Sequence, residues 1–128
     1  MPTAYIDSSA IVAIAFAEPG KIKVARQLEE FSDVWSSNLL EAEVRATYSR
    51  VGEPFDFDSL ANINWIFPDR TLTLEISMVV EAGYVRGADM WHLATALYMT
   101  PDPREVTFIT LDERQAEVAR VLGFRGWS

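Results

Sequence analysis

Short apolar segments that are typical of β-strands alternate with helical patterns along this chain of 128 residues. The clearest strand is Val106 to Thr110, which is rich in β-branched and aromatic residues, and Thr3 to Ile6 is a second. Val34 to Ser36 and Thr71 to Leu74 complete the expected set. Strands this short and apolar, separated by helices, predict an α/β fold in which helices cover both faces of a parallel sheet.

Apolar residues at helical spacing predict the segments that connect these strands. Helices are expected at Ser8 to Phe16, Ile22 to Phe31, Asn38 to Val51, Leu60 to Ile66, the stretch after Leu74 as far as Ala82, Asp89 to Tyr98, and Glu113 to Leu122. Asn38 is expected to cap its helix, and Gly52 and Gly123 to end theirs. A last edge strand is expected at Phe124 to Trp127. A chain of this length is expected to form a single domain over residues 1–128.

The composition limits the classes of function that the chain can serve. It has no cysteine, which excludes disulfides and thiolate metal sites and fits a cytoplasmic location. No signal peptide is visible, and the longest apolar run, Ala10 to Ala17, is too short to span a bilayer. The net charge of −8 argues against broad binding of nucleic acid, which usually requires a basic face. It is compatible with a nuclease whose metal ligands are acidic, and with a basic protein partner.

Two aspartates follow the two clearest strands. Asp7 comes directly after Thr3 to Ile6, and Asp112 follows Val106 to Thr110. Each can cap the helix that comes next, and Gln115 lies where a capping-box partner of Asp112 would be. Each can also bind a ligand, because ligands of open α/β sheets lie at the carboxyl ends of the strands. The sequence leaves both roles open, but it places both side chains at one edge of the sheet.

The third acidic position lies on the helix expected at Asn38 to Val51. Glu41 and Glu43 are two residues apart, so they point to nearly opposite sides of that helix. Glu43 borders the inward stripe, whereas Glu41 precedes Arg45 by four residues, which is the favourable order for a surface ion pair. We therefore assign Glu43 to the candidate site and Glu41 to solvent.

The fourth acid, Asp89, stands at the start of an expected helix, where it can act as a cap or as a site carboxylate. His92, the only histidine, follows three residues later on the same face of that helix. A single histidine in such a position is more often structural than a ligand, so His92 is not assigned to the site.

Four carboxylates at one edge of a sheet favour metal-dependent phosphodiester chemistry. Two unit charges about 4 Å apart repel by about 4 kcal/mol at an effective dielectric constant of about 20, so these acids need a cation or shared protons. Mg²⁺ and Mn²⁺ prefer oxygen ligands, keep several waters, and can activate one of them beside a phosphate. The predicted catalytic and metal-binding residues are Asp7, Glu43, Asp89 and Asp112. The hydroxyls of Ser9 and Thr110 can orient ligands or a bound water.

Four short motifs resemble those of PIN-domain proteins, and in particular the VapC-type toxins of toxin–antitoxin pairs. The matching stretches are Asp7 to Gly20, Ser36 to Val44, Arg86 to Ala96, and Phe108 to Asp112 with its continuation at Ala119 to Phe124. Each motif is weak singly, but their order over nearly the whole chain is specific. The segment from Gly52 to Tyr84 contributes little, and Trp91 is bulkier than the small residue expected before the histidine.

The resemblance implies a PIN-like three-layer α/β/α sandwich with a short, mostly parallel central sheet. It implies an endoribonuclease that depends on Mg²⁺ or Mn²⁺ and acts as a homodimer on RNA such as transfer or ribosomal RNA. It also implies a cognate antitoxin that covers the acidic site. Arg45, Arg86 and Arg114 lie near the acids in the sequence and are weaker candidates for contact with substrate phosphates, since surface ion pairing is the commoner role.

Other interpretations fit the residues less well. A signalling receiver domain would need paired acids after the first strand and a late lysine, but serines follow Asp7 and the only lysines are Lys21 and Lys23. An aspartyl phosphatase would need an acid where Ser9 stands. A solitary RNA-processing nuclease, or a PIN-like binding module without activity, stays compatible with the sequence.

Overall fold

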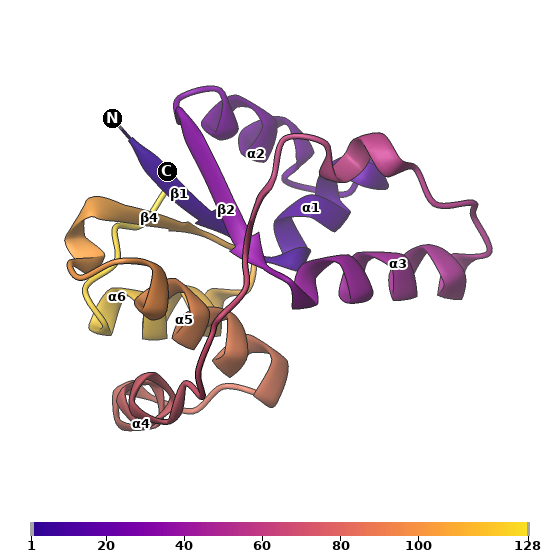
Figure 1. Ribbon diagram of the computed structural model, residues 1–128. Helices are drawn as coiled ribbons and strands as arrows, with labels where there is room; N and C mark the ends of the chain where they lie inside the picture. Colours follow the sequence, from indigo (N-terminus) through magenta and orange to yellow (C-terminus); the bar gives the residue numbers. More distant parts are fainter. Residues whose placement is uncertain (1, 128) are drawn as a thin grey trace.

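The computed structural model describes residues 2–127, in which helices cover both faces of a four-stranded sheet (Figure 1). The strands are β1 (Thr3–Ile6), β2 (Asp33–Ser37), β3 (Asn64–Ile66) and β4 (Val106–Ile109). They lie in the order β3-β2-β1-β4, and every neighbouring pair is parallel. The predicted three-layer α/β/α fold is therefore confirmed, and its described sheet is wholly parallel rather than mostly so.

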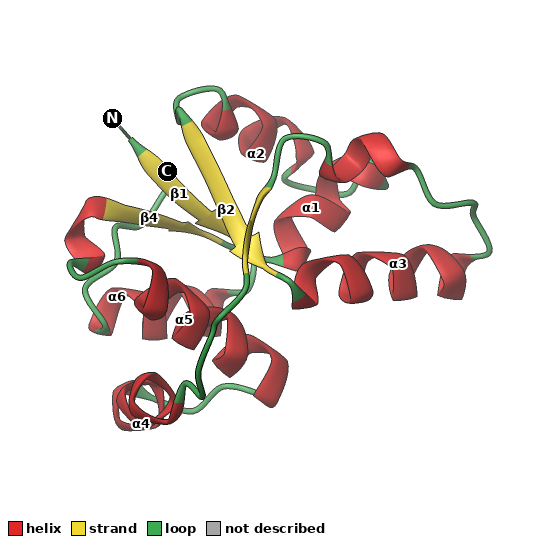
Figure 2. Ribbon diagram, in the orientation of Figure 1, coloured by secondary structure: helices red, strands yellow, loops and turns green. Residues whose placement is uncertain are grey.

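Figure 2 shows the helices in red around this sheet. They are α1 (Ser8–Ala15), α2 (Lys21–Leu28), α3 (Leu39–Val51), α4 (Thr73–Ala82), α5 (Gly87–Met99) and α6 (Glu113–Val121). Two short 3₁₀ helices, Phe57–Leu60 and Pro103–Glu105, precede β3 and β4. Within residues 2–127, none of the helices combines the length and the apolar character needed to cross a membrane.

Alternation along the strands builds a separate core on each face of the sheet. Ala4 and Ile6 of β1 pack with α1, α2 and α3, in a cluster that includes Val24 and Val44. Tyr5, between them in the sequence, packs with the cluster formed by α4, α5 and α6. A strand imposes this period of two on its side chains. Because both faces are covered, successive residues of β1 and β4 are buried on both sides of the sheet, as predicted for these two strands.

The strand order creates a crevice at the carboxyl ends of β1 and β4. The chain leaves β1 to form β2 on one side, and it later returns to place β4 on the other side. Ligands of open parallel sheets bind at such a switch point, where the helices after the two strands diverge. Asp7 follows β1, and Asp112 follows β4, so both lie beside this crevice.

Two elements predicted for the middle of the chain are wrong. Residues 60–66 are not a helix, because residues 64–66 form β3 and pair with β2, with Trp35 opposite Asn64 and Ser37 opposite Ile66. Residues 71–74 are not a strand, because Leu72 is buried with only 1% of its surface exposed, and α4 begins at the next residue. In both places, tertiary contacts override the local preference.

Other predicted features also differ from the structure. Residues 124–127 form no strand, and a single bridge joins Arg125 to Thr107. Helix α5 begins at Gly87, so Asp89 lies inside the first turn and is not the cap. Asn38 makes no side-chain capping bond, because the hydroxyl of the preceding serine accepts the first free N–H of α3 instead.

Candidate active site

The four predicted acids line one open pocket at the carboxyl end of the sheet. They come from four elements: Asp7 from the end of β1, Glu43 from α3, Asp89 from α5, and Asp112 from the start of α6. The pocket has a volume of about 700 Å³, and its other lining residues include Ser9, Glu18, Arg50, Arg86 and Leu111. The fold thus brings together side chains that are far apart in the sequence.

Asp7 is held by hydrogen bonds to both of its carboxylate oxygens. Its Oδ1 accepts the Ser9 hydroxyl at 2.7 Å and the backbone N–H of Ala10 at 3.3 Å. Its Oδ2 accepts the Thr110 hydroxyl at 2.5 Å. Both hydroxyls in turn accept backbone N–H groups from the loop after β4. Asp7 therefore caps α1 and lines the pocket at the same time, so the two roles left open by the sequence coexist.

Burial raises the pKa of Asp7 to about 6. Only 3% of its surface is exposed, and the loss of hydration outweighs the hydrogen bonds from Thr110 and Ser9 and the nearby His92, which all lower the pKa. A buried carboxylate that stays costly to ionise despite three hydrogen bonds is typical of a functional site rather than of a helix cap alone.

In metal-free protein, the free energy of unfolding is expected to fall as the pH rises from about 4 to about 6. Unfolded Asp7 loses its proton near pH 3.8, whereas the folded group keeps it to about 6, so the folded state binds more protons in this window. A difference of about two pKa units corresponds to about 3 kcal/mol, which is present at low pH and lost above about pH 6. Urea unfolding in EDTA gives the free energy of unfolding of the parent protein and of Asp7→Asn at each pH. If the difference between these two free energies did not change with pH, the expectation would be contradicted.

A chain of buried hydrogen bonds holds Glu43. His92 Nε2 lies 2.5 Å from Oε1 of Glu43, and His92 Nδ1 lies 2.7 Å from the Tyr5 hydroxyl. The Tyr5 oxygen also accepts the backbone N–H of Ser37 at 3.1 Å. Burial raises the pKa of Tyr5 well above its usual range, which keeps its hydroxyl protonated. A carboxylate can only accept hydrogen bonds, so His92 Nε2 donates to Glu43.

Gln115 contacts both Asp89 and Asp112, one through its buried side chain and the other through its backbone. Asp112 Oδ1 accepts the backbone N–H of Gln115 at 3.0 Å and so caps α6. The Gln115 side chain donates to the backbone carbonyl of Asp89 at 3.2 Å. Burial raises the pKa of Asp89, and the charge of Asp112 raises it further. The pocket therefore has a negative potential that a bound cation would relieve.

The predicted arginines divide between the pocket and the outer surface. Glu41 points to solvent, as predicted, and forms an ion pair with Arg45 at 3.3 Å. Arg114 is likewise paired within its own helix, at 3.1 Å. Neither of these arginines lines the acidic pocket, whereas Arg86 does, with its side chain 3.7 Å from Asp89. Contact of Arg45 and Arg114 with substrate stays a prediction.

The donor set fits a hard divalent cation that keeps much of its water shell. All four acids offer oxygen, the ligand atom that Mg²⁺ and Mn²⁺ prefer. Within residues 2–127, no three side chains of the types Asp, Glu, His and Cys stand close enough to hold an ion by themselves. Mg²⁺ commonly binds through one or two carboxylates, with water at its other positions. The open pocket suits this mode of binding better than a closed cage of protein ligands.

Three side chains around the site are not assigned to it from the sequence. His92, expected to be structural, contacts Glu43 directly. Gln115, expected only as a partner of the cap, also joins α6 to α5. Arg50 lines the pocket seven residues after Glu43. That spacing returns to the same face of a helix, so it is the one signal in the sequence that points to Arg50.

Comparison with known proteins agrees with this geometry. The family model for the PIN domain matches residues 4–121, a span that includes all four acids of the pocket. A comparison with curated proteins found no match. Since the family match covers nearly the whole chain, this protein belongs to the PIN domain family.

Proposed function

We propose that this protein is an endoribonuclease that uses Mg²⁺ or Mn²⁺ bound by Asp7, Glu43, Asp89 and Asp112. PIN domains are generally metal-dependent nucleases that act on RNA or other nucleic acids. The observation that carries the proposal is the convergence of four carboxylates from separate segments in one open pocket. Carboxylates gathered in this way repel one another and destabilise the fold unless they bind a cation. Their presence in one pocket therefore supports a catalytic role.

Each part of the pocket has a distinct task in this proposal. A bound cation would supply an activated water and would neutralise charge on the scissile phosphate. Asp7, fixed through both oxygens, would hold it together with Glu43 and Asp89, in part through bound water, and Asp112 would complete the set through water. Arg86 and the newly identified Arg50 lie on the lining, where guanidinium groups can contact substrate phosphates.

His92 acts as a positioning residue in this proposal, because it donates to Glu43 from within the core. His92→Ala is expected to lower kcat about ten- to a hundredfold, with a smaller change in KM, as is typical of a lost contact behind a ligand. His92→Gln keeps an N–H donor and is expected to recover part of that loss. Melting curves of both variants separate unfolding from mispositioning, and equal losses of activity in the two would reduce His92 to a packing role.

We further propose that the protein is a cytoplasmic VapC-type toxin, which forms a homodimer and is inhibited by a cognate antitoxin. The order of the four motifs supports this assignment, and the net charge of −8 suits a basic partner segment. Helix α4 also exposes Leu74 and Met78, one turn apart, with 76% and 49% of their surfaces accessible. Neighbouring exposed apolar side chains of this kind are suited to a protein interface.

The proposal is tested by incubating the purified protein with transfer, ribosomal and single-stranded RNA in Mg²⁺ or Mn²⁺ and mapping the new ends. Internal cuts that require the cation are expected. If the RNA stayed intact under all of these conditions, the protein would be interpreted instead as a PIN-like binding module without catalytic activity. Cuts that the product of the neighbouring gene fails to suppress would favour a solitary RNA-processing nuclease.

A further inference from the structure

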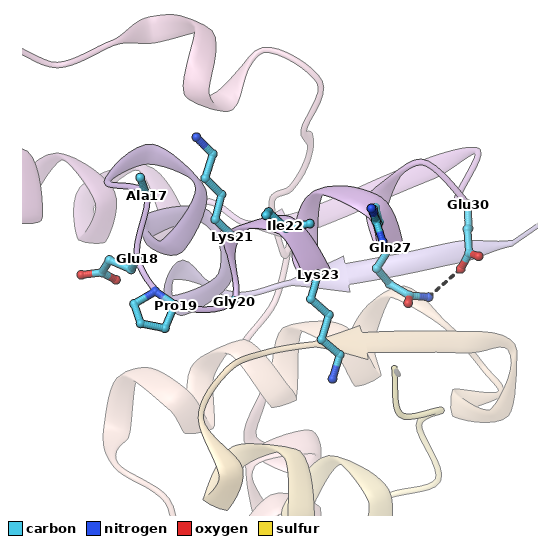
Figure 3. A pocket seen from close by; sticks show the side chains of 10 residues that line it. Ala17, Glu18, Pro19, Gly20, Lys21, Ile22, Lys23, Gln27 and Glu30 are labelled. Atoms are coloured by element: carbon cyan, nitrogen blue, oxygen red, sulfur yellow. Dashed lines mark hydrogen bonds between the residues drawn. The ribbon is translucent and has the colours of Figure 1, made fainter.

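A second groove, of about 810 Å³, lies over the turn between α1 and α2 (Figure 3). Its lining residues are Ala17, Glu18, Pro19, Gly20, Lys21, Ile22, Lys23, Arg26, Gln27 and Glu30, and we call it the α2 groove. Three of these side chains are cationic, and they include the only two lysines of the chain. Glu18 and Glu30 also line the groove, so its cations exceed its acids by one, in a protein whose net charge is −8.

Two contacts join the α2 groove to the acidic pocket. Glu18 lines both of them. The ammonium of Lys23 lies 4.8 Å from the centre of the Trp127 ring, and the Trp127 indole N–H donates to the backbone carbonyl of Thr110 at 2.9 Å. Thr110 is also the residue whose hydroxyl donates to Asp7. The position of Lys23 is thus tied through Trp127 to the loop that shapes the site.

Cationic side chains without an acidic partner gather at these two places. Within residues 2–127, the arginines paired with carboxylates are Arg45, Arg70, Arg86, Arg104 and Arg114. The cations that have no such pair in this part of the chain are Lys21, Lys23, Arg26, Arg50, Arg120 and Arg125. Four of these six line the α2 groove or the acidic pocket. Charges that are not neutralised within the protein are available to an anionic ligand.

We propose that the α2 groove binds the sugar–phosphate backbone of single-stranded RNA beside the bond that is cut, through Lys23 and Arg26. The link to cleavage rests on the ribonuclease function proposed above. Lys23 and Arg26 are three residues apart on α2, a spacing that places them on neighbouring positions of one helix face. Lys21 leaves the helix on the side opposite to Lys23 (Figure 3). Backbone contacts of this kind add affinity without reading sequence. The groove therefore anchors the flanking strand, while the pocket holds the reacting phosphate.

The test is the binding of a fluorescently labelled single-stranded RNA of about 20 nucleotides, measured by anisotropy in EDTA so that no cleavage occurs. The double variant Lys23→Gln, Arg26→Gln is expected to bind about tenfold more weakly at low salt. When the logarithm of the association constant is plotted against the logarithm of the salt concentration, the slope for this variant is expected to be smaller in magnitude by about 1.4. Each phosphate contact that is lost removes about 0.7 from that slope. The matched control is Arg120→Gln, Arg125→Gln, which removes the same charge outside both pockets and is expected to bind like the parent.

All four substituted side chains are exposed, so the melting temperatures of both double variants should match that of the parent. Equal weakening in the two double variants would assign the effect to net charge and overturn the proposal, as would a parent protein that does not bind the RNA. If the parent protein cleaved RNA in the presence of metal but the Lys23→Gln, Arg26→Gln variant bound RNA as tightly as the parent, the role of the α2 groove would be rejected and the ribonuclease function would stand. Binding that depends on Lys23 and Arg26 without any cleavage would support the groove and reject the ribonuclease function.

Discussion

Asp7→Asn is expected to reduce RNA cleavage by about a thousandfold or more while leaving the fold intact. A neutral amide lacks the charge that a divalent cation requires from its carboxylate ligands. Asp7 is the least exposed of the four acids and the one held through both oxygens, so no neighbour can take its place. The loss is therefore expected in kcat rather than in the binding of RNA.

The contacts of Asp7 can adapt to asparagine without loss of structure. The amide oxygen can still accept the Ser9 hydroxyl and the Ala10 N–H. The amide nitrogen would face Thr110, whose hydroxyl can turn its proton toward Oε1 of Gln115, 3.3 Å away. Removing a carboxylate that burial makes costly is also expected to stabilise the metal-free protein at neutral pH.

A matched control separates the site from a general effect of charge. Asp33→Asn removes one negative charge from an exposed position at the start of β2, outside the acidic pocket, and is expected to cleave like the parent. Cleavage rates and melting curves are measured side by side for the two variants. An Asp7→Asn protein that cuts RNA at the parent rate would falsify the assignment of the site.

Removal of divalent cations is expected to have the second large effect. EDTA should abolish cleavage, and added Mg²⁺ or Mn²⁺ should restore it, because in the proposed function the bound cation would activate the attacking water. The cation should also raise the melting temperature, since only the folded chain forms the pocket. At ten times its Kd, a ligand stabilises by about 1.4 kcal/mol, or about 5 °C for a chain of this size.

The metal effect should depend on pH in a defined direction. The cation competes with the proton that Asp7 binds with a pKa of about 6, so the shift in melting temperature should grow as the pH rises through that value and level off above it. Asp7→Asn is the control, and its shift should be small at every pH. A melt that is unchanged in millimolar metal, or a shift that Asp7→Asn retains in full, would place metal binding elsewhere.

The strands that position the site are predictable because their signals are local. Residues 3–6 and 106–109 are apolar and bordered by helix starts, which is typical of strands buried on both faces. Asn64 to Ile66 lacks such a signal, since a strand of three residues is too short to show a period and forms only through pairing with β2. Residues 71–74 have strand-forming side chains, but Leu72 fills the core beside α4 instead of joining the sheet.

The acids of the pocket, and the hydroxyls of Ser9 and Thr110 that bind Asp7, are predictable from their places at strand ends and on helix faces, but the side chains that contact Glu43 and Asp89 are not. His92 meets Glu43 from 49 positions away and Tyr5 from 87 positions away. Gln115 reaches the backbone of Asp89 across 26 positions. Such contacts depend on how three elements are rotated against one another, and each element taken alone is compatible with many rotations.

By itself, the amino-acid sequence determined the α/β layering and the edge of the sheet at which the acids gather, because hydrophobic period and helix starts are properties of neighbouring residues. Only the tertiary structure decided which oxygen of Asp7 meets which hydroxyl, that His92 faces Glu43, and that the α2 groove shares Glu18 with the acidic pocket. The reason is that strand order and helix rotation are set by packing over the whole molecule, which no short stretch of chain encodes.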